Sequence, residues 1–185
     1  VQVFWGLDKK LAQRKHFPSL NWITSHSNYE GILETFFNSF DPNFVENKNL
    51  IKKILQDEDD LTEVVQLIGK DSLSEDQKLI LDVAKIIQED FLAQNSFTSY
   101  DYFCPLKKSA GMMNCIANYF NNALKALKEG QGESKKSWAG VKLKTNELWI
   151  DLSKLKFMEP NLKDEKYDKI FSEKIKKQDE IFRNL

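Results

Sequence analysis

Hydrophobic residues recur with a helical period along most of this chain, and the clearest pattern lies between residues 61 and 97. Its first part predicts a short buried helix that ends at Gly69, because glycine readily adopts the left-handed conformation of a helix C-cap. Two overlapping capping boxes, starting at Ser72 and Ser74, predict the beginning of a second helix. We expect that helix to reach Gln94 as a rigid rod about 30 Å long. The apolar positions that define the pair are Leu61, Val64, Val65, Ile68, Leu79, Ile80, Val83, Ile86, Ile87 and Phe91.

Most of the remaining chain shows the same period. Asp41-Pro42 is expected to separate two helices, and the acidic run 56–60 leads into the next one. The segment after Pro105 carries apolar stripes on two sides, which predicts the most buried helix. The polar, glycine-containing stretch 129–136 is interpreted as an internal linker. In chain order, helices are expected over 29–40, 44–55, 61–68, 75–94, 105–128, 138–155 and 167–182.

The first 26 residues follow a different pattern. β-branched and aromatic residues predict a strand over 1–5, and Asp8 is placed to cap a short basic helix over 9–15. Pro18 favours an extended conformation for Phe17, so Phe17 is expected on a loop. A lone strand exposes unpaired backbone groups, and we expect this one to fray, to pair with another chain or to aggregate. Because the chain opens with neither Met nor a signal peptide, we expect a piece of a longer protein.

Composition narrows the classes of partner. The chain has 185 residues, of which 41% are hydrophobic and 12% aromatic, enough to fill the core of one domain. The net charge of −1 provides no field that would attract nucleic acid or an acidic membrane. Two cysteines without a CxxC spacing, and no apolar run near eighteen residues, fit a reduced intracellular protein. We therefore expect no nucleic acid partner and no direct membrane insertion.

Motifs of autonomous chemistry are missing from the sequence. No GxxxxGK[ST] phosphate-binding loop occurs, because Gly69-Lys70 is followed by Asp71 and lacks the upstream glycine. His16 and His26 lie on different local structures, which favours locally hydrogen-bonded or solvated side chains over a shared metal. The acidic clusters are more simply explained by a helix N-terminus and a solvated face than by a metal site or acid–base chemistry. Composition and spacing alone thus predict a mostly α domain with no metal.

One family accounts for several segments together. The sequence FWGLDKKLAQRKHFPSLNW, residues 4–22, resembles the segment that closes the nucleotide-binding domain in catalytic A subunits of V-type proton ATPases. LTEVVQLIGK, LILDVAKIIQEDFLAQN and YDYFCP continue the resemblance in the same order, over most of residues 1–128. It implies a mostly α fold, the C-terminal helical-bundle domain of a rotary ATPase catalytic subunit. Residues 1–26 would be a strand-loop remnant of the α/β nucleotide-binding domain, and residues 27–185 the helical domain.

The resemblance also implies a function. The complete subunit would hydrolyse ATP, bound with Mg, to drive proton transport across a membrane. Its partners would be the B subunits and the central-stalk rotor subunits, and its location cytoplasmic, in the peripheral sector of a membrane-associated complex. This part alone would not be catalytic and would hold no nucleotide tightly, because the P-loop lysine, catalytic glutamate and magnesium ligand have no counterpart here.

Two groups of residues match functional positions of the family. Phe17, in the HFP loop, and Phe97, after the long helix, match the aromatic residues that sandwich adenine, and Gln94 and Asn95 are candidates for contacts with the adenine edge. The second group matches the turn that faces the rotor, which in the related synthase subunit reads DELSEED. Two of its acids are replaced here. This rotor-facing turn comprises Asp71, Ser72, Leu73, Ser74, Glu75, Asp76 and Gln77, and we expect it to be exposed to solvent.

A second interpretation stays open at this point. The chain could be a non-catalytic helical module for protein–protein interaction that shares the architecture without the chemistry. The sequence upstream would decide between the two, because a strand followed by GxxxxGK[ST] and a helix marks the catalytic protein.

Overall fold

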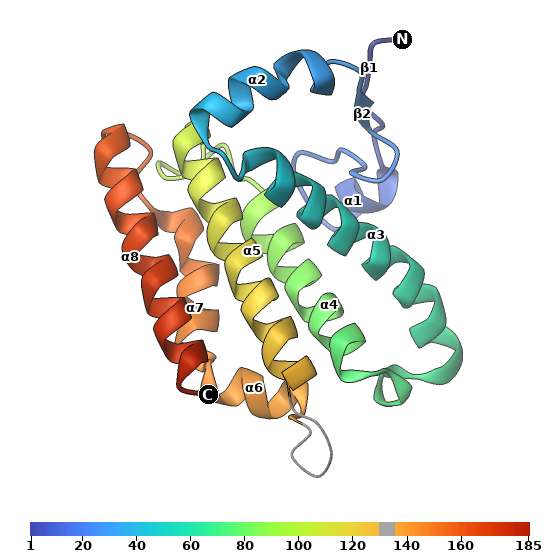
Figure 1. Ribbon diagram of the computed structural model, residues 1–185. Helices are drawn as coiled ribbons and strands as arrows, with labels where there is room; N and C mark the ends of the chain where they lie inside the picture. Colours follow the sequence, from blue (N-terminus) through green and yellow to red (C-terminus); the bar gives the residue numbers. More distant parts are fainter. Residues whose placement is uncertain (130–135) are drawn as a thin grey trace.

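The structure is a computed structural model that describes residues 1–129 and 136–185. It is 70% helical, as predicted, and most of the expected linker 129–136 lies outside the described residues. Figure 1 shows α5 in the middle of the bundle, with α4 and α8 on either side and α2 across one end. The elements are β1 (Val3–Phe4), α1 (Lys9–Gln13), β2 (His26–Ser27), α2 (Glu30–Phe40), α3 (Phe44–Ile68), the 3-10 turn η1 (Lys70–Ser72), α4 (Glu75–Ile86), the π-helical segment η2 (Ile87–Leu92), α5 (Leu106–Glu129), α6 (Trp138–Lys144), α7 (Asn146–Lys154), the 3-10 turn η4 (Leu155–Phe157) and α8 (Asp164–Arg183).

The N-terminal strand finds its partner within the chain, which corrects the prediction that it lacks one. β1 pairs with β2 in antiparallel register, with Val3 opposite Ser27 and Phe4 opposite His26. The predicted cap of the following helix is present, since the Asp8 carboxylate accepts a hydrogen bond from the Lys10 backbone N–H at 2.7 Å. The pattern of residues 1–5 predicts a strand but carries no information about where the second strand lies.

α3 is one continuous helix of 25 residues, where the sequence predicted two separated by the acidic run 56–60. The helix continues through the acids because its buried face runs on from Leu55 to Leu61, while Asp59 and Asp60 are exposed to solvent. Glu58 is half-buried and accepts a hydrogen bond from the Gln88 side chain at 2.8 Å. Its last turn is not the buried stripe that was predicted. Ile68 is 56% exposed, and the helix extends beyond the elements that cover its first half.

The start of α4 was predicted correctly, and its continuation was not. The Ser74–Gln77 capping box is present, whereas the overlapping box at Ser72 is not formed, because the Ser72 hydroxyl donates to the Ile68 carbonyl. After Ile86 the α-helix widens into η2 and ends at Leu92, two residues before the predicted end. The predicted rigid rod is therefore an α-helix joined to a π-helical segment.

The core forms around α5, which is the most buried helix, as predicted. It packs against α3, α4, α6, α7 and α8. The single helix predicted over 138–155 is divided at Thr145, which is wholly buried and bonds through its hydroxyl to the Tyr119 hydroxyl and the Val141 carbonyl. Hydrophobic spacing continues across this break, so the sequence pattern did not show it. In the part of the chain described, no helix combines the length and the apolar character that crossing a membrane requires.

Candidate functional site

The loop that carries Phe17 is attached to the end of η2. The backbone carbonyl of Phe17 accepts a hydrogen bond from the Gln94 N–H at 2.6 Å. One residue earlier, Nε2 of His16 lies 2.9 Å from the Gln88 carbonyl oxygen, and the nearly buried His16 ring packs against Trp22. These contacts bring together two segments that lie more than seventy residues apart in the sequence.

A second network shapes the loop after η2. The buried carboxylate of Asp101 accepts a hydrogen bond from the Asn95 N–H at 2.7 Å. The Asn95 side-chain oxygen in turn accepts from the Phe97 N–H at 3.0 Å, and the Asn95 carbonyl accepts from the Thr98 hydroxyl. Because side-chain oxygens satisfy the backbone donors of this turn, the loop holds one conformation while the Phe97 ring points away from the core.

Lys108 attaches this loop to the opposite side of the bundle. Its side chain is buried, and its Nζ donates to the backbone carbonyls of Tyr100, Lys156 and Met158 at 2.8, 2.6 and 2.9 Å. Burial lowers the pKa of the Lys108 ammonium below its ordinary value, although Asp101 nearby acts in the opposite direction. One buried cation thus joins the Phe97 loop to the segment that follows α7.

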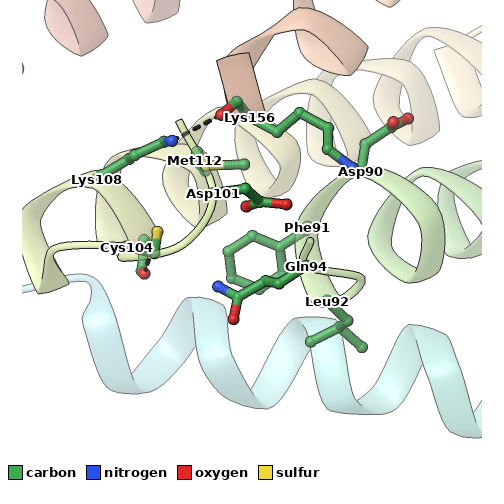
Figure 2. A pocket seen from close by; sticks show the side chains of 10 residues that line it. Asp90, Phe91, Leu92, Gln94, Asp101, Cys104, Lys108, Met112 and Lys156 are labelled. Atoms are coloured by element: carbon green, nitrogen blue, oxygen red, sulfur yellow. Dashed lines mark hydrogen bonds between the residues drawn. The ribbon is translucent and has the colours of Figure 1, made fainter. Parts of the chain in front are cut away.

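A cavity of about 250 Å³ lies beneath the same loop (Figure 2). Gln94 and Asp101 line it together with Cys104 and Lys108. Burial also raises the pKa of Asp90, at the far side of the cavity, above its usual range. Neither Phe17 nor Phe97 lines this cavity.

The two predicted aromatic residues are exposed at this end of the molecule. Phe17 is 56% exposed and Phe97 is 98% exposed. Among the described residues, neither ring pairs with another aromatic ring. The Phe97 ring is almost fully open to solvent, and the Phe17 ring is partly covered. Gln94 and Asn95 are exposed beside them. The structure therefore joins the Phe17 loop directly to Gln94, three residues before Phe97.

Sequence reasoning missed the residues that position these loops. His16 was expected to be solvated or locally hydrogen-bonded, and its Nδ1 does lie 3.3 Å from the Pro18 carbonyl oxygen. The sequence did not show that the other ring nitrogen reaches Gln88 in η2. The roles of Asp101 and Lys108 were not predicted, because an acid in a polar loop and a lysine next to another lysine are typical of a protein surface. The one signal in the sequence was that Lys108 falls within an otherwise apolar stripe of α5, beside Met112.

The turn between α3 and α4 lies at the other end of α4 (Figure 1). Asp71, Ser72, Ser74 and Asp76 are exposed, as predicted, Glu75 and Gln77 are half-buried, and Leu73 is only 5% exposed. The expectation of a wholly exposed turn is therefore wrong at Leu73, whose apolar side chain is buried.

Two carboxylates tie this turn to α6. Glu75 accepts hydrogen bonds from the Lys78 ammonium and from the Trp138 N–H, and these hold its pKa below the ordinary value. Asp82 accepts from the Trp138 indole at 2.9 Å and from Lys142 at 2.8 Å, and pairs with Lys70 at 3.3 Å. Burial acts to raise the pKa of Asp82, but these partners together lower it.

Comparison with known proteins identifies the family. A profile of the C-terminal domain of V and A type ATP synthase matches residues 33–136, more than half of the chain. The chain belongs to this family. The matched range of this V/A-type ATP synthase domain contains the 71–77 turn, Gln94, Asn95 and Phe97, whereas Phe17 lies before it.

Individual relatives agree with the family match. The chain is 51% identical over 162 residues to the V-type proton ATPase catalytic A subunit of Beta vulgaris, covering 86% of this chain and 26% of that protein. It is 52% identical over 160 residues to the corresponding protein of Cyanidium caldarium, covering 86% and 27%. The corresponding protein of Encephalitozoon cuniculi is 48% identical over 168 residues, covering 88% and 27%. The chain thus spans about a quarter of the length of these relatives.

Proposed function

We propose that this chain is the part of a V-type proton ATPase catalytic A subunit that completes the adenine pocket and faces the central rotor. The complete subunit would hydrolyse ATP, with Mg, to drive protons across a membrane, as part of a peripheral cytoplasmic sector. The observation that carries the proposal is the direct attachment of the Phe17 loop to Gln94, three residues before Phe97.

We assign adenine recognition to the loops that carry Phe17 and Phe97. Two exposed aromatic rings on loops held by His16 and Asp101 suit a planar base, and stacking contributes about 1–3 kcal/mol per face. Gln94 and Asn95 offer amide donors and acceptors for the edge of the ring. Phosphates and Mg would be bound by the P-loop region of the nucleotide-binding domain and by an arginine from a neighbouring B subunit. Residues 1–26 are assigned to that nucleotide-binding domain, and residues 27–185 to the helical domain.

Substitution in a complete subunit tests this assignment. Phe17→Ala or Phe97→Ala should raise KM for ATP more than it lowers kcat, because adenine is bound alike in the ground and transition states. Loss of one stacking face should raise KM by roughly tenfold. Phe103→Ala is the matched control, since Phe103 is 54% exposed in the same connection and has no assigned role. An unchanged KM in both test variants, or an equal rise in the control, would refute the assignment.

The 71–77 turn is assigned to contact with the rotor. The hydrogen bonds of Glu75 and Asp82 connect the turn and α4 to α6. A force applied to the turn by the rotor would therefore move α4 and α6 together as one rigid body. Insertion of glycines between Asp71 and Leu73 should therefore uncouple ATP hydrolysis from proton pumping in the reconstituted enzyme. If pumping per ATP stayed unchanged, the turn would have no role in coupling.

A further inference from the structure

An apolar groove separates the N-terminal segment from the helices, away from Phe17 and Phe97. It has a volume of about 340 Å³, at the small end of the range for small-molecule sites. The apolar side chains that line it include Trp22, Leu55, Phe91, Leu106 and Met113. Leu55 and Met113 are buried, while Leu106 is 39% exposed, so the groove leads from the core to the surface.

The rim of the groove carries net positive charge. Among the described residues, the charged side chains that line it are Glu30, Lys48 and Lys52. The Lys48 ammonium lies 2.9 Å from the Glu30 carboxylate, and this hydrogen bond holds the pKa of Glu30 below its ordinary value. Within the described parts of the chain, no carboxylate oxygen lies within ion-pair distance of Lys52. Lys52 acts on Glu30 only through space, as a second positive charge that also lowers the pKa of this carboxyl group. The two lysines and one glutamate leave a net charge of +1 at the mouth of the groove, with Lys52 exposed.

We propose that this groove binds a small amphipathic carboxylate, with its apolar tail between Trp22 and Met113 and its carboxylate beside Lys52. An apolar tail would displace water from walls contributed by the N-terminal segment, α3, η2 and α5. The charge at the rim selects an anion over a neutral molecule or a cation. The inference goes beyond the proposed function and does not depend on it.

The groove also has a structural connection to the aromatic loops. Trp22 packs against His16, which bonds to Gln88 in η2, and Phe91 belongs to η2 as well. A ligand in contact with Trp22 and Phe91 would bridge the two segments that His16 already joins. It should therefore strengthen the attachment of the Phe17 loop to the helices.

The three methionines of the chain provide a site-specific test. Decanoate is titrated into the chain labelled with ¹³C at the methionine methyl groups, and the NMR signals of Met112, Met113 and Met158 are followed. The Met113 methyl lines the groove and should shift in a saturable manner, whereas Met112 and Met158 lie outside its lining and should move little. Decanol, which has the same tail without the charge, should bind about fivefold more weakly.

Two lysines of α3 form the matched pair of variants. Lys52→Gln should weaken decanoate binding by about fivefold and leave decanol binding unchanged. Lys53→Gln should change neither, because Lys53 is exposed on the same helix but does not line the groove. The proposal is overturned if Met113 shows no saturable shift, if all three methyl groups shift alike, or if the two variants behave the same. Failure here leaves adenine binding untouched, because that is measured on the Phe17 and Phe97 loops.

Discussion

Three side chains that the sequence did not mark as functional hold the loops of the candidate adenine site in place. His16, Asp101 and Lys108 each satisfy backbone groups of a loop, and each is buried or nearly so. A buried polar group without a hydrogen-bond partner costs free energy. A change of loop conformation would break these hydrogen bonds, so they hold the loops in place. Phe17 and Phe97 are candidates because of the resemblance to the family, and their role stays a prediction. The supporting roles of His16, Asp101 and Lys108 could not be predicted. His16 and Lys108 reach backbone groups more than forty residues away, and the contact of Asp101 with Asn95 lies within a loop that has no periodic pattern.

Lys108→Met tests the support of the Phe97 loop. Methionine keeps the length of the side chain but leaves the carbonyls of Tyr100, Lys156 and Met158 without their donor. We expect a loss of about 1–3 kcal/mol in the free energy of unfolding, with faster hydrogen exchange in the 95–105 loop. Lys107→Met is the control, since Lys107 forms a partly exposed pair with Asp168 and should cost less than about 1 kcal/mol. Equal effects of the two substitutions would contradict this role.

The stability difference between the wild-type chain and Lys108→Met should depend on pH. The pKa of Lys108 is lowered in the folded state, so the unfolded state binds more protons in the interval between that pKa and the ordinary value of 10.5. Stability rises with pH wherever the unfolded state binds more protons. The wild-type chain should therefore gain stability relative to Lys108→Met as the pH rises toward 10.5. Denaturant unfolding of both proteins across this interval measures the difference, and a constant difference would contradict the lowered pKa.

At the scale of elements, helices and strands were predicted well where their limits depend on neighbouring residues, and poorly where they depend on residues far apart in the sequence. The beginning of α4 follows from Ser74 and Gln77, which lie three residues apart, and the structure confirms it. The break at Thr145 depends on Tyr119, 26 residues earlier in the chain, and no periodicity shows such a partner. The pairing of β1 with β2 was missed for the same reason. Elements set by a few neighbouring residues can be read from this sequence, while their ends and partners depend on packing.

The contact between α5 and α8 gives a prediction at this scale. Gly111 lies where a Cβ atom would overlap the ring of Phe171, so the two helices can approach only because this residue has no side chain. Gly111→Ala should lower the free energy of unfolding by about 1–3 kcal/mol. Gly31→Ala, in α2, meets nothing within 4 Å and should raise stability by roughly 0.4–1 kcal/mol. Denaturant unfolding of both variants measures the two signs, and a shift in the same direction would contradict the packing argument.

For the molecule as a whole, α4 separates the two proposed functional ends. The turn at residues 71–77 is fixed to α6 at one end, and η2 leads to the Phe97 loop at the other (Figure 1). The α-helical part spans about 18 Å, and the π-helical segment follows before the Phe97 loop. Motion at the turn would therefore reach the nucleotide through the packed bundle, with η2 as the point where helix geometry changes.

Titration of this chain with ATP and with adenosine, followed by NMR, is the most direct test of the central claim. Two stacking faces contribute at most about 6 kcal/mol, and a millimolar dissociation constant already requires about 4 kcal/mol. Binding should therefore be millimolar or weaker, nearly equal for the two ligands, and confined to the Phe17 and Phe97 loops. Micromolar affinity, a strong preference for the triphosphate, or shifts that leave these two loops unchanged would contradict the account.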